Sequence, residues 1–284
     1  MDQKTLIYRK DWDLLIILDA CRYDYFKKYA YGFFEKCFDC KLSKTISPAS
    51  HTYEWARKVL QPIRWKDVIY VSANPYINSR APVRDLDLRN NFFYIYDAWL
   101  HDWDEELQTV LPDVLTKRAK ELIETYPAKR FIVHYIQPHA PYIKQRIKGF
   151  WRDFMEVKGN TKSYIPKPLR NCLSHVIQHY IPLPLLRWYW RYQLRKGVKA
   201  GGEVVGFAEL SLKEWRKAYI DNLLLACKYV VQLIEETLTC YDKIVITADH
   251  GEMLGDRWLF GWKVGHATGL KYKQLIEVPW LEIA

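Results

Sequence analysis

Long apolar runs are absent from this 284-residue chain. No stretch approaches the roughly 20 apolar residues that a membrane-spanning helix needs. The apolar run from Leu14 to Leu18 is also too short for a signal peptide, and the ten residues at the start of the chain are mostly polar or charged. These absences lead us to expect a cytoplasmic protein, at most peripheral to a membrane.

Cysteine pairs are also scarce. The six cysteines include a single Cys-x-x-Cys pair, formed by Cys37 and Cys40. A structural zinc site needs a second such pair or a His-x₃-His pair, and the sequence has neither. A thioredoxin-like pattern around the pair is missing as well. We therefore predict ordinary reduced thiols.

Acidic residues are rare between residues 144 and 199. This segment holds 13 Lys and Arg but only 2 Asp and Glu, which accounts for the whole net charge of +10. Residues 180–196 add the mixture of Trp, Leu and Arg that is typical of interfacial segments. One interpretation is a solvated basic face, whose Lys and Arg stems cover apolar surface. The other is contact with a membrane surface or a lipid-linked ester, while nucleic acid is disfavoured.

Strand-like and helix-like patterns alternate along the chain. Helical periodicity covers 111–126 and 212–238. Short apolar runs predict strands at 13–19, 68–72, 93–97, 130–136 and 243–248, with an edge-like strand at 277–281. The alternation predicts an α/β fold, a three-layer α/β/α sandwich with a mainly parallel central sheet. We expect one domain over 1–284, with an insertion at 144–207 over one end of the sheet.

Residues that can bind a metal follow two of these strands. Asp249 offers a carboxylate oxygen and His250 an imidazole nitrogen, a pair that suits Zn²⁺, Mn²⁺ or a similar cation. Gly251 allows the backbone to turn closely there. Asp19 closes the strand at 13–19, where a buried carboxylate needs a metal or another cation. Because ligands of open α/β sheets gather beyond the carboxyl ends of strands, we expect these side chains to meet.

Three further clusters carry candidate functional residues. The turn from Ser47 to Thr52 enters a helix, where a hydroxyl meets backbone N–H groups and the positive end of the helix dipole. That position suits an anionic ester group. The other two clusters are Pro138-His-Ala-Pro-Tyr142 and Lys263-Val-Gly-His266.

These clusters, in this order, resemble the alkaline phosphatase superfamily, and most closely its sulfatase-like branch. The resemblance covers residues 13–281 and is strongest over 247–255, 265–266 and 278–280. The Pro-His-Ala-Pro-Tyr segment looks like the Pro-His-x-Pro signature of that branch. Asp19-x-x-Arg22 looks like its first metal-ligand turn. The resemblance implies an alkaline phosphatase-like fold whose single domain is catalytic, with the insertion over the active-site end.

The resemblance also implies a metal site and a nucleophile. One divalent ion (Zn, Mn, Mg or Ca) would be bound by Asp19, a hydroxyl, Asp249 and His250. Single-metal members place the hydroxyl several residues before an acid–aromatic pair, which is Glu54-Trp55 here. Counting back indicates Ser50 as nucleophile and metal ligand, with Thr52 as the second candidate and Ser47 as the third.

Two departures from the family pattern refine the expectation. Sulfatases carry Cys-x-Pro-x-Arg or Ser-x-Pro-x-Arg, from which their formylglycine nucleophile is made. Here Pro48 follows Ser47 directly and no Arg comes after it, which argues against formylglycine sulfatase activity. Two-metal members need an additional acid–histidine pair. His139 and His266 have no evident acidic partner in the sequence, so one metal is favoured over two.

The expected function is therefore metal-dependent hydrolysis of phosphate (or sulfate) esters through a covalent Ser or Thr intermediate. His139 and His266 would hold the ester or protonate the leaving group, and Arg22 and Lys263 would help to bind the substrate. Two alternatives remain open. One is a transferase that moves a phospho-headgroup onto a lipid or glycan acceptor. The other is an inactive metal-binding interaction protein.

Overall fold

The computed structural model describes residues 2–9, 12–148, 179–256 and 260–283. The part before the predicted insertion contains α1 (Gln3–Arg9), β1 (Leu14–Leu18), α2 (Tyr23–Tyr25), the π-helical turn η1 (Phe26–Ala30), α3 (Tyr31–Cys37), β2 (Cys40–Ile46), α4 (Thr52–Val59), β3 (Trp65–Ser72), β4 (Phe92–Asp97), α5 (Ala98–His101), β5 (Trp103–Asp104), β6 (Thr109–Val110), α6 (Pro112–Thr125) and β7 (Arg130–Tyr135). The later part contains α9 (Leu183–Arg195), α10 (Gly202–Glu209), α11 (Leu212–Thr237), β8 (Ile244–Thr247), β9 (Met253–Leu254), β10 (Val264–Gly265), α12 (Lys273–Ile276) and β11 (Glu277–Ile283).

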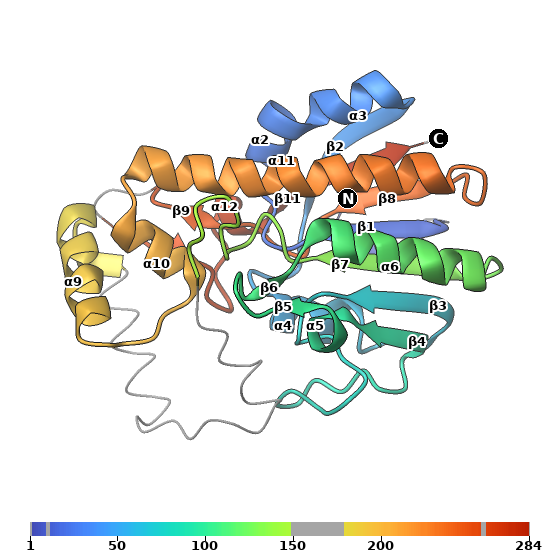
Figure 1. Cartoon of the computed structure of the whole chain (residues 1–284), viewed down its shortest axis with the longest axis horizontal. Helices are drawn as coiled ribbons and strands as arrows, with labels where there is room; N and C mark the ends of the chain where they lie inside the picture. The colour runs from blue at the N-terminus through green and yellow to red at the C-terminus, as the bar shows by residue number, and fades with distance from the viewer. Residues whose placement is uncertain (1, 10–11, 149–178, 257–259, 284) are drawn as a thin grey trace.

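A seven-stranded sheet forms the centre of the molecule (Figure 1). Its strand order is β2-β11-β8-β1-β7-β3-β4. Neighbouring strands are parallel except where β11 pairs with β8 and β2. The mainly parallel α/β sheet predicted from the sequence is thus confirmed. Because β1 lies between β8 and β7, the carboxyl ends of these three strands meet at the middle of one sheet edge.

Both faces of the sheet are covered, which follows from the side-chain alternation of its strands. Along β1, Leu14, Ile16 and Leu18 pack in one core cluster with residues of α6 and α11. Leu15 and Ile17 point to the other face, where they join residues of α1 and α4. All five side chains are fully buried, and each burial stabilises the fold by about 1.5–3 kcal/mol.

The sequence predicted that the last strand lies at an edge of the sheet, but in the structure this strand lies inside the sheet. β11 lies between β8 and β2 and pairs with β2 over its whole length, from Glu277↔Ile46 to Ile283↔Cys40. The prediction was wrong because β2 itself was not recognised. β2 is mostly exposed and carries Lys41 and Lys44, as edge strands often do, so it lacks a continuous apolar run.

The predicted insertion at 144–207 is described only in part, since residues 149–178 lie outside the described residues. Its later half forms α9 and the start of α10, and α9 lies at one end of the molecule (Figure 1). Leu183 and Leu186 of α9 pack in a third cluster with Ala140, Leu254 and Val264. The insertion therefore contacts loops that follow β7 and β8.

The described residues bear on the cysteines and on membrane-spanning helices. The described cysteines, Cys37 and Cys40 included, form no disulfide with one another. Within the described ranges, we find no helix with the length and apolar character needed to cross a bilayer.

The core provides a first test of the fold. Leu233 of α11 is completely buried in the cluster shared with β1, whereas Glu235 on the same helix is exposed. We expect Leu233→Ala to lower the free energy of unfolding by about 2–5 kcal/mol. Glu235→Ala should change it by no more than about 0.5 kcal/mol in urea denaturation. Equal effects of the two changes would contradict the placement of α11.

Candidate active site

Two carboxylates and one imidazole meet where β1 and β8 end. Asp19 directly follows β1, and Asp249 and His250 follow β8 by two and three residues. His250 Nε2 lies 3.4 Å from Asp19 Oδ1 and 3.5 Å from Asp249 Oδ2. All three side chains are almost fully buried. The structure therefore brings together three of the four metal ligands predicted from the sequence, and one ligand atom of each lies within 4.8 Å of the others.

Backbone geometry at the two strand ends fixes these side chains. Ala20 adopts a left-handed φ of 60°, which is uncommon for a residue other than glycine. The resulting turn directs Ala20 N toward Asp249 Oδ1, to which it donates at 3.1 Å. Gly251 is required where it stands because a Cβ there would collide with the backbone carbonyl of Gln274. The strand ends are thus held in one arrangement before any ligand binds.

Neighbouring polar groups orient the ligand atoms. Asn74, which follows β3, donates its side-chain amide to Asp19 Oδ2 at 2.7 Å. His250 Nδ1 lies 2.8 Å from Gly251 O, a carbonyl that can only accept. The proton is therefore on Nδ1, and the lone pair of Nε2 faces the carboxylates. This is the orientation that a histidine needs in order to bind a metal.

The residues present fit a divalent cation. Burial raises the pKa of Asp19 well above its usual range, and the neighbouring charge of Asp249 raises it further. Asp249 Oδ2 is buried without a hydrogen-bond partner among the described residues. Such an oxygen is costly to bury unless a cation or a donor compensates it. Two carboxylates and an imidazole in this arrangement are a donor set for a divalent metal ion.

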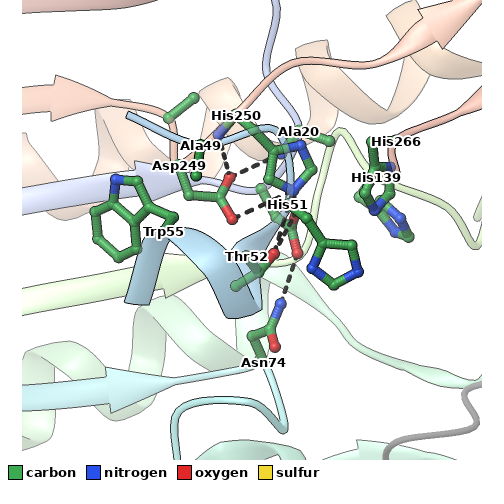
Figure 2. Close-up of polar contacts among 12 residues, drawn as sticks. Ala20, Ala49, His51, Thr52, Trp55, Asn74, His139, Asp249, His250 and His266 are labelled. Atoms are coloured by element: carbon green, nitrogen blue, oxygen red, sulfur yellow. Dashed lines mark hydrogen bonds and ion pairs between the residues drawn. The ribbon is translucent and has the colours of Figure 1, made fainter. Parts of the chain in front are cut away.

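Thr52 carries the hydroxyl that reaches this donor group. Thr52 is the first residue of α4, and its Oγ1 lies 3.5 Å from Asp19 Oδ1 and 3.2 Å from His250 Nε2. Figure 2 shows Thr52, Asp249 and His250 directed toward one another. The start of α4 adds the positive end of the helix dipole at the same place, and the His51 side chain caps the helix by accepting from Tyr53 N at 3.1 Å.

The two serine candidates lie elsewhere. Ser50 Oγ donates to Ala267 O at 2.7 Å and accepts from Leu270 N at 3.1 Å, so it ties α4 to the loop beyond β10. Ser47 Oγ donates to the backbone carbonyl of Asp249. Both hydroxyls hold the backbone around the site. The order of candidates drawn from the sequence, with Ser50 ahead of Thr52, is not the order that the geometry gives.

A second group of donors lies beside the first. His139, which follows β7, and His266, which follows β10, have ring centroids 4.9 Å apart (Figure 2). His266 Nδ1 lies 3.1 Å from Glu252 Oε2. Glu252 is the acidic partner that the sequence had not revealed. The described residues thus contain two donor groups, although the number of bound metal ions stays a prediction.

Histidine imidazoles dominate this side of the site. The ring of His266 is 4.4 Å from that of His250 and 5.2 Å from that of His51. Burial lowers the pKa of His139 to about 4 and that of His51 to about 3, with a further lowering from His250 nearby. His139 and His51 are therefore neutral near pH 7. His139 Nδ1 lies 2.5 Å from Ala140 O, which can only accept, so the His139 proton is on Nδ1 and its Nε2 is an acceptor. His51 Nδ1 accepts from Tyr53 N, so the His51 proton is on Nε2.

Arg22 and Lys263, expected to bind substrate, are engaged with the protein itself. Arg22 makes a bidentate pair with Asp24 at 2.9 and 2.7 Å and a second pair with Asp256 at 2.7 Å. Lys263 Nζ donates to the carbonyls of His179 at 2.8 Å and Gly261 at 3.0 Å. In the structure, both cations bind neighbouring loops rather than lying beside Thr52.

Sequence reasoning also missed a histidine behind the site. His134 lies within β7 and is completely buried, with Nδ1 2.9 Å from the Tyr70 hydroxyl. Its Nε2 has no hydrogen-bond partner among the described residues and lies 3.9 Å from the equally unpartnered Asp249 Oδ2. A histidine inside an apolar strand was the available signal, because a buried imidazole needs polar partners.

Comparisons with known proteins agree with this arrangement. No family model matches the chain, and no curated protein matches its sequence. Solved structures do match. The C-terminal periplasmic domain of EptC from Escherichia coli, in complex with zinc, aligns with 100% of this chain and 75% of its own, at a TM-score of 0.56 and 14% identity. The soluble domain of lipooligosaccharide phosphoethanolamine transferase A from Neisseria meningitidis aligns with 95% of this chain and 75% of its own, at a TM-score of 0.52 and 12% identity. Phosphonate monoester hydrolase of Agrobacterium radiobacter aligns with 95% of this chain and 67% of its own, at a TM-score of 0.51 and 14% identity.

The chain has the fold of the alkaline phosphatase superfamily. The fold implied by the sequence resemblance is thereby confirmed. In this alkaline phosphatase-like fold, the central strands deliver Asp19, Asp249 and His250 to one sheet edge, and the start of α4 supplies Thr52. At 12–14% identity, these similarities show the fold alone.

His134 offers a test of the metal site. Second-layer partners of metal ligands typically contribute 10–100-fold to metal affinity. We expect His134→Ala to weaken Zn²⁺ or Mn²⁺ binding by about that factor, because Asp249 loses the group facing its Oδ2. Competition with a chromophoric chelator measures this directly. His101→Ala, which removes an exposed histidine at the end of α5, should leave the affinity unchanged. Unchanged affinity in His134→Ala would contradict the assignment.

Proposed function

We propose that this protein is a metal-dependent enzyme that cleaves phosphate esters, with Thr52 as the nucleophile. The observation that carries the proposal is the position of the Thr52 hydroxyl, 3.5 Å from Asp19 and 3.2 Å from His250 at the start of α4. The hydroxyls of Ser50 and Ser47 hydrogen-bond to backbone groups and support the site instead. The cytoplasmic location expected from the sequence stays a prediction.

Asp19, Asp249, His250 and the Thr52 oxygen would hold the divalent ion. When bound, the ion supplies a Lewis acid that favours the deprotonated hydroxyl and neutralises negative charge. The zinc in the EptC structure makes Zn²⁺ one candidate, with Mn²⁺, Mg²⁺ and Ca²⁺ as the others. Asn74 keeps Asp19 oriented, and Gly251 O keeps the proton of His250 on Nδ1.

The chain's own residues would then act on the phosphoryl group. The Thr52 hydroxyl gives up its proton to water, Thr52 Oγ1 attacks phosphorus, and the bond from phosphorus to the leaving-group oxygen breaks. The positive end of the α4 dipole would stabilise the phosphoryl oxygens, which carry the developing charge. His266 donates its Nε2–H to the departing alcohol while its Nδ1 takes a proton from the Glu252 carboxyl, whose pKa burial raises well above its usual range. His139 lies against His266 on the same side of the site.

The second half of the reaction decides between hydrolysis and transfer. A water molecule or an acceptor hydroxyl attacks the phospho-Thr52 intermediate, the bond to Thr52 Oγ1 breaks, and the attacking oxygen loses its proton. Hydrolysis is our first hypothesis. The transferase hypothesis has equal support from the structural comparisons, since the similar structures include a phosphoethanolamine transferase and a phosphonate monoester hydrolase.

We propose an anionic ester, lipid- or glycan-linked, as the substrate class. The lipooligosaccharide named for the Neisseria transferase is a lipid-linked glycan, which is one reason for this proposal. The positive net charge of +10 also favours anionic partners. The alternative of an inactive binding protein is disfavoured because Asp19, Thr52, Asp249 and His250 are all present and converge.

Substitution of the hydroxyl residues tests the nucleophile. We expect Thr52→Ala to lower kcat on an aryl phosphate ester by about 10³-fold or more, because the attacking oxygen is removed. Thr52→Ser keeps the hydroxyl and should retain part of the activity. Acid-quenched wild-type protein should carry a phosphoryl group on the peptide that contains Thr52, which mass spectrometry detects.

Ser50→Ala is the matched control for the nucleophile. It should reduce activity far less than Thr52→Ala, since the Ser50 hydroxyl hydrogen-bonds to the backbone of residues 267 and 270. Full activity in Thr52→Ala would overturn the proposal. Loss of activity and of the phosphopeptide in Ser50→Ala alone would instead restore the candidate that the sequence favoured.

Product analysis separates hydrolysis from transfer. We expect a hydrolase to release one equivalent of free phosphate per ester cleaved, whatever alcohol is added. A transferase should convert an added acceptor, such as a glycan or a lipid with a free hydroxyl, into its phosphorylated form at the expense of free phosphate. Quantitative ³¹P NMR of the products distinguishes the two outcomes.

A further inference from the structure

The helix α9 has a basic and aromatic face that the active site does not use. Leu185, Trp188 and Tyr192 lie one helical turn apart on this face, with exposed fractions of 58%, 65% and 43%. The rings of Trp188 and Tyr192 are stacked, 5.8 Å apart. Large exposed apolar side chains that are contiguous in this way mark an interaction surface.

Charge on and after α9 is of one sign. Arg191, Arg195, Lys196 and Lys199 are exposed, and no Asp or Glu occurs between residues 179 and 202. Lys196 Nζ lies 4.6 Å from the centroid of the Tyr192 ring, so cations and aromatic rings share the face. The opposite side of the helix is anchored by the buried Leu183 and Leu186. The exposed face therefore is complementary to an extended anionic surface.

A cavity lies at the root of this face. It has a volume of about 310 Å³ and is lined by Leu183, Pro184, Arg187, Trp188, Arg191 and Leu212. The Nε atoms of Arg187 and Arg191 donate to Phe207 O and Ala208 O at the end of α10, at 3.0 and 2.6 Å. Arg187 Nη2 has no hydrogen-bond partner among the described residues. Two fixed guanidinium groups beside an indole ring suit the phosphate of a lipid headgroup.

We propose that α9 docks the protein on an anionic lipid surface, with Leu185, Trp188 and Tyr192 in the interface and the cations on lipid phosphates. Trp and Tyr rings settle at the boundary between headgroups and acyl chains, and Lys and Arg stems reach from that depth back to the phosphates. Such a face binds reversibly and is not a membrane span. Its strength rises with the anionic lipid content of the bilayer.

Docking through α9 would also set the position of the active site. The cluster that holds Leu183 and Leu186 includes Ala140, next to His139, and Val264, two residues before His266. α10 connects the two regions, since it packs on α9 and contacts β10. The histidine side of the site is therefore joined to the docking helix by a continuous core. A lipid-linked ester would reach the site from the same membrane.

Vesicle flotation with the full chain tests the docking surface without relying on catalysis. We expect wild-type protein to float with phosphatidylcholine vesicles that contain 30% phosphatidylglycerol and not with pure phosphatidylcholine. The difference arises because several basic residues are attracted to the anionic lipid. Arg195→Gln/Lys196→Gln should weaken partitioning by roughly tenfold or more. Trp188→Ser should weaken it as well, because interfacial apolar area is lost.

Matched controls lie on another part of the molecule. Lys36→Gln/Lys41→Gln removes the same charge from α3 and β2, and Phe33→Ser removes an exposed ring from α3 (Figure 1). Both should float like the wild type. Thermal melting checks that all variants fold.

Three results would overturn the proposal: no flotation of the wild type with anionic vesicles, equal losses in the α3 and α9 variants, or α9-dependent binding of single-stranded RNA without vesicle binding. An inactive but vesicle-bound protein would reject the proposed function and leave the docking surface standing.

Discussion

Two carboxylates buried side by side are the constraint on which the rest of this site depends. Asp19 and Asp249 are brought together by sheet register, because Ile17 pairs with Thr247 and each Asp lies two residues farther along its strand. Ion pairs with Arg or Lys do not compensate them among the described residues. Burial and the charge of Asp249 raise the pKa of Asp19, so a cation between the two carboxylates would favour their ionised forms. The sheet thus places two carboxylates where a divalent metal ion would compensate their charge.

The turn before α4 divides three hydroxyls between two tasks. Ser47 holds the backbone of Asp249, and Ser50 holds the loop that follows His266. Thr52, as the first helical residue, is left to face the carboxylates and the imidazole. The serines are structural in this arrangement because they connect the three segments that must keep their relative positions. The Thr52 hydroxyl, which we propose as the nucleophile, is thereby held in a fixed position.

Much of the fold was predictable because its central strands are buried on both faces. Such strands read as short, nearly continuous apolar runs, which is why β1, β7 and β8 were recognised, along with the candidate metal ligands at the ends of β1 and β8. β2 was missed because an exposed edge strand needs no apolar run. Glu252, Asn74 and His134 were missed or left without a role, since each acts through a partner far away in sequence.

The sequence by itself determined which chemical groups are available and at which strand ends they stand. Local patterns were sufficient for this, because strand burial and turn chemistry depend on a few consecutive residues. Only the tertiary structure decided which hydroxyl faces Asp19, which acid supports His266, and that Arg22 is bound by Asp24 and Asp256. A side chain's direction in a turn depends on contacts between segments hundreds of residues apart, and residue spacing carries no information about those contacts.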